Sequence, residues 1–290
     1  MAIKFEKIEF CYHPGTPFEQ LALVDVNASV ENGDFVAIVG QTGSGKSTLV
    51  QLINALLLPR KGKIFVNNLT VTGNKKEVDF KDLRKHVGLL FQFPEYQLFE
   101  ESVIKDVMFG PLNFGYTEDA AMKQSIEALR MVGIDESLFE KSPLELSGGQ
   151  KRRVAIAGVL SSDPDVIILD EPTSGLDPKG TRDIMSIFKE LNEKYNKTII
   201  LICHDMNVVY EYANNVIAMK NGSVAYSGSS VDMFGDEKLL EYLSLEAPRV
   251  VRFANELNKK GFSTNPKLIR NMDDLVDSIV KEMKLWETLL

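Results

Sequence analysis

The chain has 290 residues, of which 44% are hydrophobic and 26% are charged, and its formal net charge is -8. This composition is typical of a globular protein with one large domain or two ordinary ones. The negative charge argues against a general nucleic-acid-binding surface, since nucleic-acid phosphate would repel it. The cysteines Cys11 and Cys203 have no metal-ligand spacing, and a disulfide is not expected.

The N-terminal segment MAIKFEKIEF lacks the apolar run of a signal peptide. Apolar runs elsewhere fall well short of the roughly 20 residues that a membrane span needs. We therefore expect a protein of a reducing cytosol, which reaches a membrane only through a partner.

Short apolar runs alternate with amphipathic segments along the chain, which predicts an α/β fold with a parallel sheet. Buried parallel strands lose the alternation of side chains because both of their faces are covered. Such strands are predicted at Phe35–Val39, Val166–Leu169 and Thr198–Cys203, with antiparallel strands at Ile3–Phe10 and Gly62–Val71. Helices are predicted at Lys46–Leu58, Asp119–Val132, Gln150–Leu160 and Pro178–Tyr195.

The pattern changes near Gly235, which predicts a division of the chain at that point. We expect one domain at residues 1–235, with a helical subdomain at about 95–162, and a C-terminal helical extension at 236–290. Asn265-Pro266 separates two helical patterns within the extension. The extension is either a cap on the main core or a contact surface for a second chain.

The sequence GQTGSGKST follows the predicted strand Phe35–Val39 and opens a helical pattern. This is the context of a Walker A loop, in which backbone N–H groups and the helix N-terminus surround phosphates. Lys46 would reach the β- and γ-phosphates of ATP, and the Ser47 hydroxyl would bind Mg²⁺. The predicted ATP-binding residues of the loop are Gly40, Gln41, Thr42, Gly43, Ser44, Gly45, Lys46, Ser47 and Thr48.

The sequence VIILDEP places two carboxylates at the end of a second buried strand. Ligands of α/β sheets bind at the carboxyl ends of the strands. Asp170 would hold Mg²⁺ there, and Glu171 would polarise the water that attacks the γ-phosphate. Phosphoryl transfer needs mainly such positioning and charge neutralisation.

The stretch LSGGQKRR, Leu146–Arg153, resembles the signature sequence of ATP-binding cassette (ABC) ATPases. Gln92 matches the Q-loop glutamine of that family, SGLDP at Ser174–Pro178 matches the D-loop, and His204 matches the switch histidine. Tyr12 matches the aromatic that stacks on adenine, with Phe10 as a rival candidate. The resemblance covers roughly residues 3–235 and implies a P-loop NTPase (RecA-like) core with an antiparallel β subdomain and a helical subdomain.

The resemblance also implies an enzyme in which the signature of one chain closes over the ATP of another. The residues that would contact ATP across this dimer are Ser147, Gly148, Gly149, Gln150 and Asp177. Glu171 and His204 would be catalytic. Ser47, Gln92 and Asp170 would hold Mg²⁺, so the implied cofactors are ATP and Mg²⁺.

FQFPEYQLFEE, residues 91–101, keeps neither a helix nor a strand period, yet it contains Phe93, Tyr96, Leu98 and Phe99. Such an apolar surface suits docking of a partner's helix in a groove. This stretch, YHPGTPFEQLALVDVN and the C-terminal helices resemble the second ATPase type of energy-coupling factor (ECF) transporters.

The ECF resemblance implies a prokaryotic importer of vitamins or transition-metal ions. Its expected partners are a second related ABC ATPase, in a heterodimer or a homodimer, a membrane coupling protein and, indirectly, a substrate-binding membrane subunit. The chain would lie on the cytoplasmic face of the cell membrane.

The alternative function is that of a soluble ABC ATPase acting on nucleic acid or ribosomes. Its usual additions are a second cassette, coiled-coil insertions, zinc sites or basic arms, and none is evident in the sequence. Lys151-Arg152-Arg153 is interpreted as a solvated helix face rather than as a nucleic-acid patch.

Overall fold

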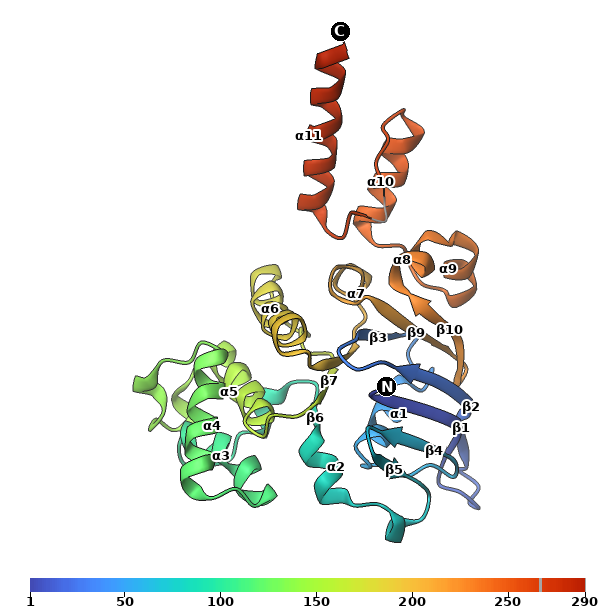
Figure 1. The fold of residues 1–290 in the computed structure, drawn as a ribbon. Helices are drawn as coiled ribbons and strands as arrows, with labels where there is room; N and C mark the ends of the chain where they lie inside the picture. Colours follow the sequence, from blue (N-terminus) through green and yellow to red (C-terminus); the bar gives the residue numbers. More distant parts are fainter. Residues whose placement is uncertain (266–267, 290) are drawn as a thin grey trace.

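The computed structural model describes residues 1–265 and 268–289, and the strands among them form two sheets (Figure 1). The smaller, antiparallel sheet has the order β2-β1-β4-β5, and the larger sheet has the order β10-β9-β3-β8-β7-β6. The strands are β1 Ile3–Tyr12, β2 Gln20–Val30, β3 Phe35–Val39, β4 Lys61–Val66, β5 Leu69–Val71, β6 Val87–Leu90, β7 Val166–Asp170, β8 Thr198–Ile202, β9 Asn215–Lys220 and β10 Ser223–Ser229.

The larger sheet is parallel from β9 to β6, and β10 pairs antiparallel with β9 at its edge. Every residue of β3 and β8 is buried, as the unalternating apolar runs of these strands predict. Parallel pairing brings the carboxyl ends of β3, β7 and β8 to one edge of the sheet. The predicted phosphate loop, the acid pair and His204 follow these three strands, so the topology gathers them at that edge.

Helices cover the sheets and build two further parts of the molecule (Figure 1). The helices are α1 Lys46–Ile53, α2 Phe80–His86, α3 Val103–Phe114, α4 Glu118–Met131, α5 Gly148–Leu160, α6 Pro178–Tyr195, α7 Met206–Tyr212, α8 Ser230–Gly235, α9 Glu237–Leu243, α10 Arg249–Lys259 and α11 Met272–Leu289. Helices α3, α4 and α5 pack on one another at one side of the larger sheet, where the helical subdomain is predicted.

Helix α1 ends at Ile53, five residues before the predicted end at Leu58. The physical reason is that Ala55 has a φ of 53°, in the left-handed region, which a right-handed helix cannot include. The N–H groups of Leu56 and Leu57 both donate to the carbonyl of Gln51 and close the helix there.

The C-terminal helices α10 and α11 project away from the sheets at the end of the molecule marked by α7, α8 and α9 (Figure 1). Val250, Val251 and Ala254 of α10 and Leu275 of α11 are buried. Pro266 of the predicted break lies outside the described residues, as do residues 267 and 290 of the predicted extension. The division at residue 235 stays a prediction.

Over residues 1–265 and 268–289, none of the helices combines the length and the apolar character required to cross a membrane.

Candidate functional site

The predicted phosphate loop connects β3 to α1 along a tight path that requires glycine at two positions. A Cβ on Gly40 would lie 2.3 Å from the carbonyl oxygen of Met219, and one on Gly45 would lie 2.8 Å from Leu23 Cδ2. Both glycines have positive φ angles, 143° and 102°. Lys46 is 6% exposed, and its ammonium donates to the carbonyls of Gly40 at 2.9 Å and Gln41 at 3.0 Å.

A cavity of about 580 Å³ lies against this loop, at the carboxyl edge of the larger sheet. It brings together residues that are far apart in the sequence. The predicted residues that line it are Tyr12, Thr42, Gly43, Gly45, Lys46, Ser47, Thr48, Gln92, Asp170, Glu171 and His204. Gln20, Leu21 and Ala22 of β2, Ile202, and the turn residues Asn221 and Gly222 also line it, and the sequence interpretation missed them. No local motif marks them, because only the packing of β2 and the β9–β10 turn on the loop places them there.

The acid pair after β7 is electrostatically unusual. Burial raises the pKa of Asp170, against the opposing effect of Lys46 and His204. Burial also raises the pKa of Glu171, assisted by the charge of Asp170 and opposed by His204. The pKa of Lys46 is lowered, because the effect of burial outweighs the opposing effect of the two carboxylates. Perturbed groups that converge in a cavity are typical of a functional site.

Glu171 has an unusual backbone conformation. Its φ is 53°, in the left-handed region that side-chain-bearing residues rarely adopt. Its N–H donates to the carbonyl of Ile202 at 3.0 Å, which joins the loop after β7 to β8. Its Oε1 is buried and accepts no hydrogen bond within the described chain, although His204 Nε2 lies 3.1 Å away. The carboxylate therefore lies within ion-pair distance of His204.

Cys203 precedes this histidine and is 3% exposed. Burial raises the pKa of its thiol to about 12, so the side chain stays protonated and packs as a small core residue.

Tyr12 rather than Phe10 borders the cavity. The Tyr12 hydroxyl lies 3.0 Å from Thr48 Oγ1, and the ring meets Phe10 edge to face at 4.8 Å. Phe10 itself is buried in the core between the sheets and α1. Of these two aromatic residues, Tyr12 is therefore the one that lines the cavity.

A magnesium ion would find oxygen ligands of a suitable kind in this cavity. Across residues 1–265 and 268–289, no cluster of three or more histidine, cysteine or acidic side chains could hold a metal by itself. Magnesium in such sites is commonly bound by one or two carboxylates, and other oxygens, including those of substrate phosphates and water, complete the octahedron. The Ser47 hydroxyl, the Gln92 carbonyl and the Asp170 carboxylate fit that pattern.

The signature segment and the D-loop aspartate lie outside the cavity. Ser147 caps α5, since its hydroxyl accepts from the Gln150 N–H at 3.3 Å and Gln150 Oε1 accepts from the Ser147 N–H at 2.9 Å. Gly148 and Gly149 are exposed, and a Cβ added at either position would meet no neighbouring atom within 4 Å. Asp177 is exposed and caps α6 through Gly180. Ser147 and Asp177 thus each cap the exposed N-terminus of a helix, α5 and α6 respectively.

The loop around Pro94–Gln97 exposes aromatic rings. Phe93 is 38% exposed, Tyr96 84% and Phe99 63%. Leu98 is only partly accessible because it packs against the main hydrophobic core. The three aromatic rings therefore supply most of the exposed apolar surface of this loop. Phe109 of α3 is 46% exposed and meets Phe99 edge to face at 4.9 Å, so it belongs to the same surface, and the sequence interpretation missed it.

The interpretation of Lys151-Arg152-Arg153 as a solvated helix face is wrong for Arg152, which is buried. It is 4% exposed and forms a two-pronged ion pair with Glu95, with N–O distances of 2.8 and 3.0 Å. The same guanidinium donates to the carbonyl of Ser174 at 2.9 Å. Arg152 thus joins the aromatic loop, the signature helix and the loop after Glu171.

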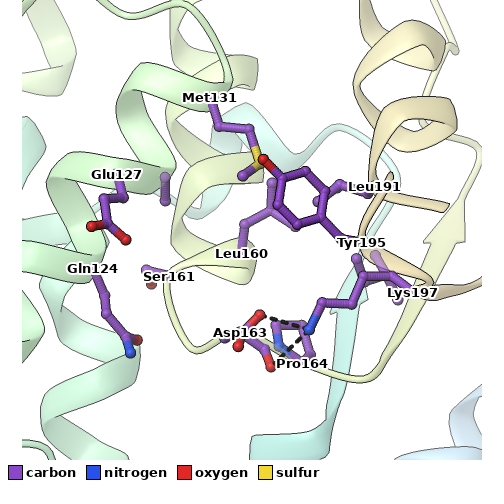
Figure 2. A pocket seen from close by; sticks show the side chains of 12 residues that line it. Gln124, Glu127, Met131, Leu160, Ser161, Asp163, Pro164, Leu191, Tyr195 and Lys197 are labelled. Atoms are coloured by element: carbon purple, nitrogen blue, oxygen red, sulfur yellow. Dashed lines mark hydrogen bonds and ion pairs between the residues drawn. The ribbon is translucent and has the colours of Figure 1, made fainter. Parts of the chain in front are cut away.

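A second cavity, of about 270 Å³, lies between α4, the end of α5 and α6 (Figure 2). Its charged groups are already partly neutralised, because Lys197 Nζ lies 2.6 Å from Asp163 Oδ1. Leu160, Leu191 and Tyr195 supply apolar walls. None of the predicted site residues lines it, so the larger cavity at the phosphate loop is the candidate site.

Comparison with known proteins decides the family. Residues 23–174 match the ABC transporter family model. The chain is 47% identical over 269 residues to the energy-coupling factor transporter ATP-binding protein EcfA2 of Caldanaerobacter subterraneus subsp. tengcongensis, which covers 93% of both chains. It is 45% identical to EcfA2 of Enterococcus faecalis over 98% of both chains.

The chain belongs to the ATP-binding proteins of energy-coupling factor transporters.

Solved structures agree with this assignment. This ATP-binding protein resembles cbiO1 of Clostridium perfringens, part of the ABC transporter complex cbiONQ, with a TM-score of 0.73, 38% identity, and coverage of 89% of this chain and 98% of that one. It also resembles the dimeric ATP-binding cassette MJ0796 bound to ADP and Pi, with a TM-score of 0.69, 31% identity, and coverage of 79% and 98%. The predicted fold class is confirmed. As a member of the ABC family, the protein is an ATPase that binds ATP.

Proposed function

We propose that this ATP-binding protein is the motor subunit of a prokaryotic importer of vitamins or transition-metal ions. The observation that carries the proposal is the convergence of Lys46, Asp170, Glu171 and His204 on one cavity beside the phosphate loop. That set provides the charge neutralisation and water positioning that ATP hydrolysis requires. The curated relatives, which are ATP-binding proteins of energy-coupling factor transporters, supply the transport context.

The residues of the cavity divide the chemistry between them. The loop N–H groups and Lys46 hold the phosphates, and Tyr12 stacks on adenine. Ser47, Gln92 and Asp170 would hold Mg²⁺, which would supply positive charge next to the phosphates. The Glu171 carboxylate accepts a proton from the attacking water, and His204 orients that water and the γ-phosphate.

We also propose that two ATPase chains build two composite sites. Ser147, Gly148, Gly149, Gln150 and Asp177 face outward from the chain's own cavity, which supports their contact with ATP held by a second chain. The intact Glu171, signature and His204 make this chain a competent half of both sites. The second chain is a related ABC ATPase, in a heterodimer with this one, although a homodimer is also compatible with these residues.

The surface formed by Phe93, Tyr96, Leu98 and Phe99 docks the coupling helix of a membrane protein, which in turn holds a substrate-binding membrane subunit. The buried Arg152–Glu95 pair supports this assignment, because it connects the exposed aromatic loop with the residues next to Glu171. The protein accordingly works at the cytoplasmic face of the cell membrane. Residues 1–235 form the nucleotide-binding domain and residues 236–290 its C-terminal extension.

The proposal is tested by purifying the chain from native membranes in mild detergent and identifying its partners by mass spectrometry. We expect a second ABC ATPase and a multi-spanning membrane protein in stoichiometric amounts. Recovery of the chain with ribosomal proteins or nucleic acid, and without membrane proteins, would contradict it.

A further inference from the structure

Helix α7 carries the switch histidine into the site and is itself held by the C-terminal helices. His204 lies one residue before Asp205, the N-cap of α7. A helix of seven residues is not stable by itself, so its position depends on tertiary contacts. The orientation of His204 therefore depends on whatever fixes α7.

The first contact is at the N-terminal end of α7. The Asn207 backbone N–H and side-chain Nδ2 both donate to Asp205 Oδ1, at 2.8 and 2.7 Å. The side-chain Oδ1 of the same asparagine accepts from the backbone N–H of Arg249 at 2.8 Å. Arg249 is the first residue of α10. One side chain thus joins the cap that follows His204 to the start of the C-terminal extension.

The second contact is at the C-terminal end of α7. Arg270, which precedes α11, lies over the ring of Tyr210 with its Cζ 5.1 Å from the centroid. Its guanidinium donates to Ser230 Oγ at 3.0 Å, to Asn214 Oδ1 at 3.3 Å and to the carbonyl of Ala213 at 3.4 Å. Ala213 is the C-cap residue of α7, directly after Tyr212.

Apolar packing joins the two contacts. Val208, Val209 and Tyr210 of α7 are buried in the same hydrophobic core as residues of the extension. The extension residues in that core are Val250, Val251, Ala254, Ile269 and Leu275. Figure 1 shows α10 and α11 rising from the region of α7 and α8, on the side away from the antiparallel sheet.

From this arrangement we propose that Asn207 and Arg270 are positioning residues, through which the C-terminal extension holds α7 and thereby orients His204 beside Glu171. The extension is then a part of the hydrolysis machinery, in addition to any role in pairing two ATPases. The inference rests on the proposed function, since it takes His204 to act on the γ-phosphate and the water.

The sharpest test removes the backbone N–H of Arg249, from which Asn207 accepts its hydrogen bond. Pro248 has φ -52° and ψ 145°, which a following proline tolerates, and position 249 is the first of a helix, where proline is favoured. Arg249→Pro therefore deletes the donor while preserving α10. Arg249→Ala is the matched control, because it removes the same exposed side chain and keeps the N–H.

In the assembled transporter complex, we expect Asn207→Ala and Arg249→Pro to lower kcat for ATP about tenfold, since small misplacements of catalytic groups are costly. KM for ATP should stay within about twofold, because the phosphate loop is untouched. The double variant should be no worse than the more impaired single variant, as groups of one contact are not additive. Arg249→Ala should retain the wild-type kcat. Asn192→Ala should retain it too, since this asparagine of α6 donates to the carbonyls of Gly33 and Lys197.

The second contact is tested with Arg270→Ala against Arg252→Ala. Arg252 is an arginine of the same extension, 56% exposed and 3.9 Å from Glu246. Arg270→Ala should lower kcat as Asn207→Ala does, without loss of the partner ATPase in size-exclusion chromatography. Equal kcat values for these variants and their controls, or a kcat loss that follows subunit dissociation alone, would overturn the inference. Failure of the proposed roles of Glu171 and His204 is distinguishable, since Glu171→Gln and His204→Ala would then leave turnover intact, and failure of the transport function is seen separately as turnover that does not respond to the membrane partners.

Discussion

Glu171 and His204 come from the ends of two adjacent buried strands, and the Oε1 of the glutamate lies 3.1 Å from the Nε2 of the histidine. The left-handed φ of Glu171 and its N–H bond to Ile202 hold this relationship in place. Backbone strain of this kind costs about 1–3 kcal/mol and persists only where the surrounding structure maintains it. The surrounding structure therefore maintains the close approach of Glu171 and His204.

Glu171→Gln should lower kcat for ATP by about 10²–10⁴-fold, because the amide keeps the shape of the side chain but cannot accept the proton of the attacking water. ATP affinity should be preserved, and the ATP-bound closed dimer should accumulate. The measurement is ATP turnover of the assembled complex, with nucleotide binding and dimerisation measured on the same preparation. Turnover within a few-fold of the wild type would exclude Glu171 as the catalytic base.

Lys46→Ala should weaken ATP binding by about tenfold or more, since a charge-assisted hydrogen bond contributes about 1.5–3 kcal/mol. Titration calorimetry with ATP measures this directly. Lys61→Ala is a suitable control, because that lysine is exposed and pairs with Glu9 at the surface. Unchanged affinity in Lys46→Ala would argue against the predicted phosphate loop.

Changing Phe93 and Tyr96 together to serine should weaken assembly with the membrane subunits by about 30-fold or more, since the loss of even one aromatic anchor that contributes about 2 kcal/mol has an effect of that size. Both rings are exposed in the isolated chain, so its thermal stability should change little. Phe18→Ser is the control, because Phe18 is 80% exposed at a different site. Normal assembly and uptake in the double variant would remove the docking assignment.

Glu95→Gln should destabilise the folded chain at neutral pH by about 3 kcal/mol, because it leaves the buried Arg152 without its anion. Burial alone would raise the pKa of Glu95, but the Arg152 hydrogen bonds outweigh it and lower the pKa. A carboxylate with a lowered pKa stabilises the fold above its unfolded value of about 4.3, and this stabilisation is lost as the pH falls through the folded pKa.

The difference in unfolding free energy between wild type and Glu95→Gln should therefore shrink as the pH is lowered below about 4.3. Urea denaturation across this pH range measures it. Glu246→Gln provides the reference, since Glu246 is 88% exposed. A difference independent of pH would contradict the assignment of the effect to the ion pair.

The sequence predicts the parts of the site whose chemistry is local. A strand, a glycine loop and a helix follow one another at Phe35–Ile53, and VIILDE ends in its acids at the edge of the same sheet. Arg152 escaped prediction because a basic triplet on a helix is usually solvated, and its partner Glu95 is 57 residues away. Asn207 and Arg270 escaped it for the same reason, since their roles exist only after α7, α10 and α11 pack. Gln20, Leu21 and Ala22 enter the site through sheet packing rather than through a motif.

The most direct test of the central claim is the ATP turnover of the purified chain, measured alone, with its membrane partners in proteoliposomes, and with added DNA or RNA. We expect slow turnover by the chain alone, a marked increase in the assembled complex, and no response to nucleic acid. Turnover that rises with DNA or RNA and is indifferent to the membrane partners would contradict the motor function and support an ABC ATPase of nucleic acid or ribosomes.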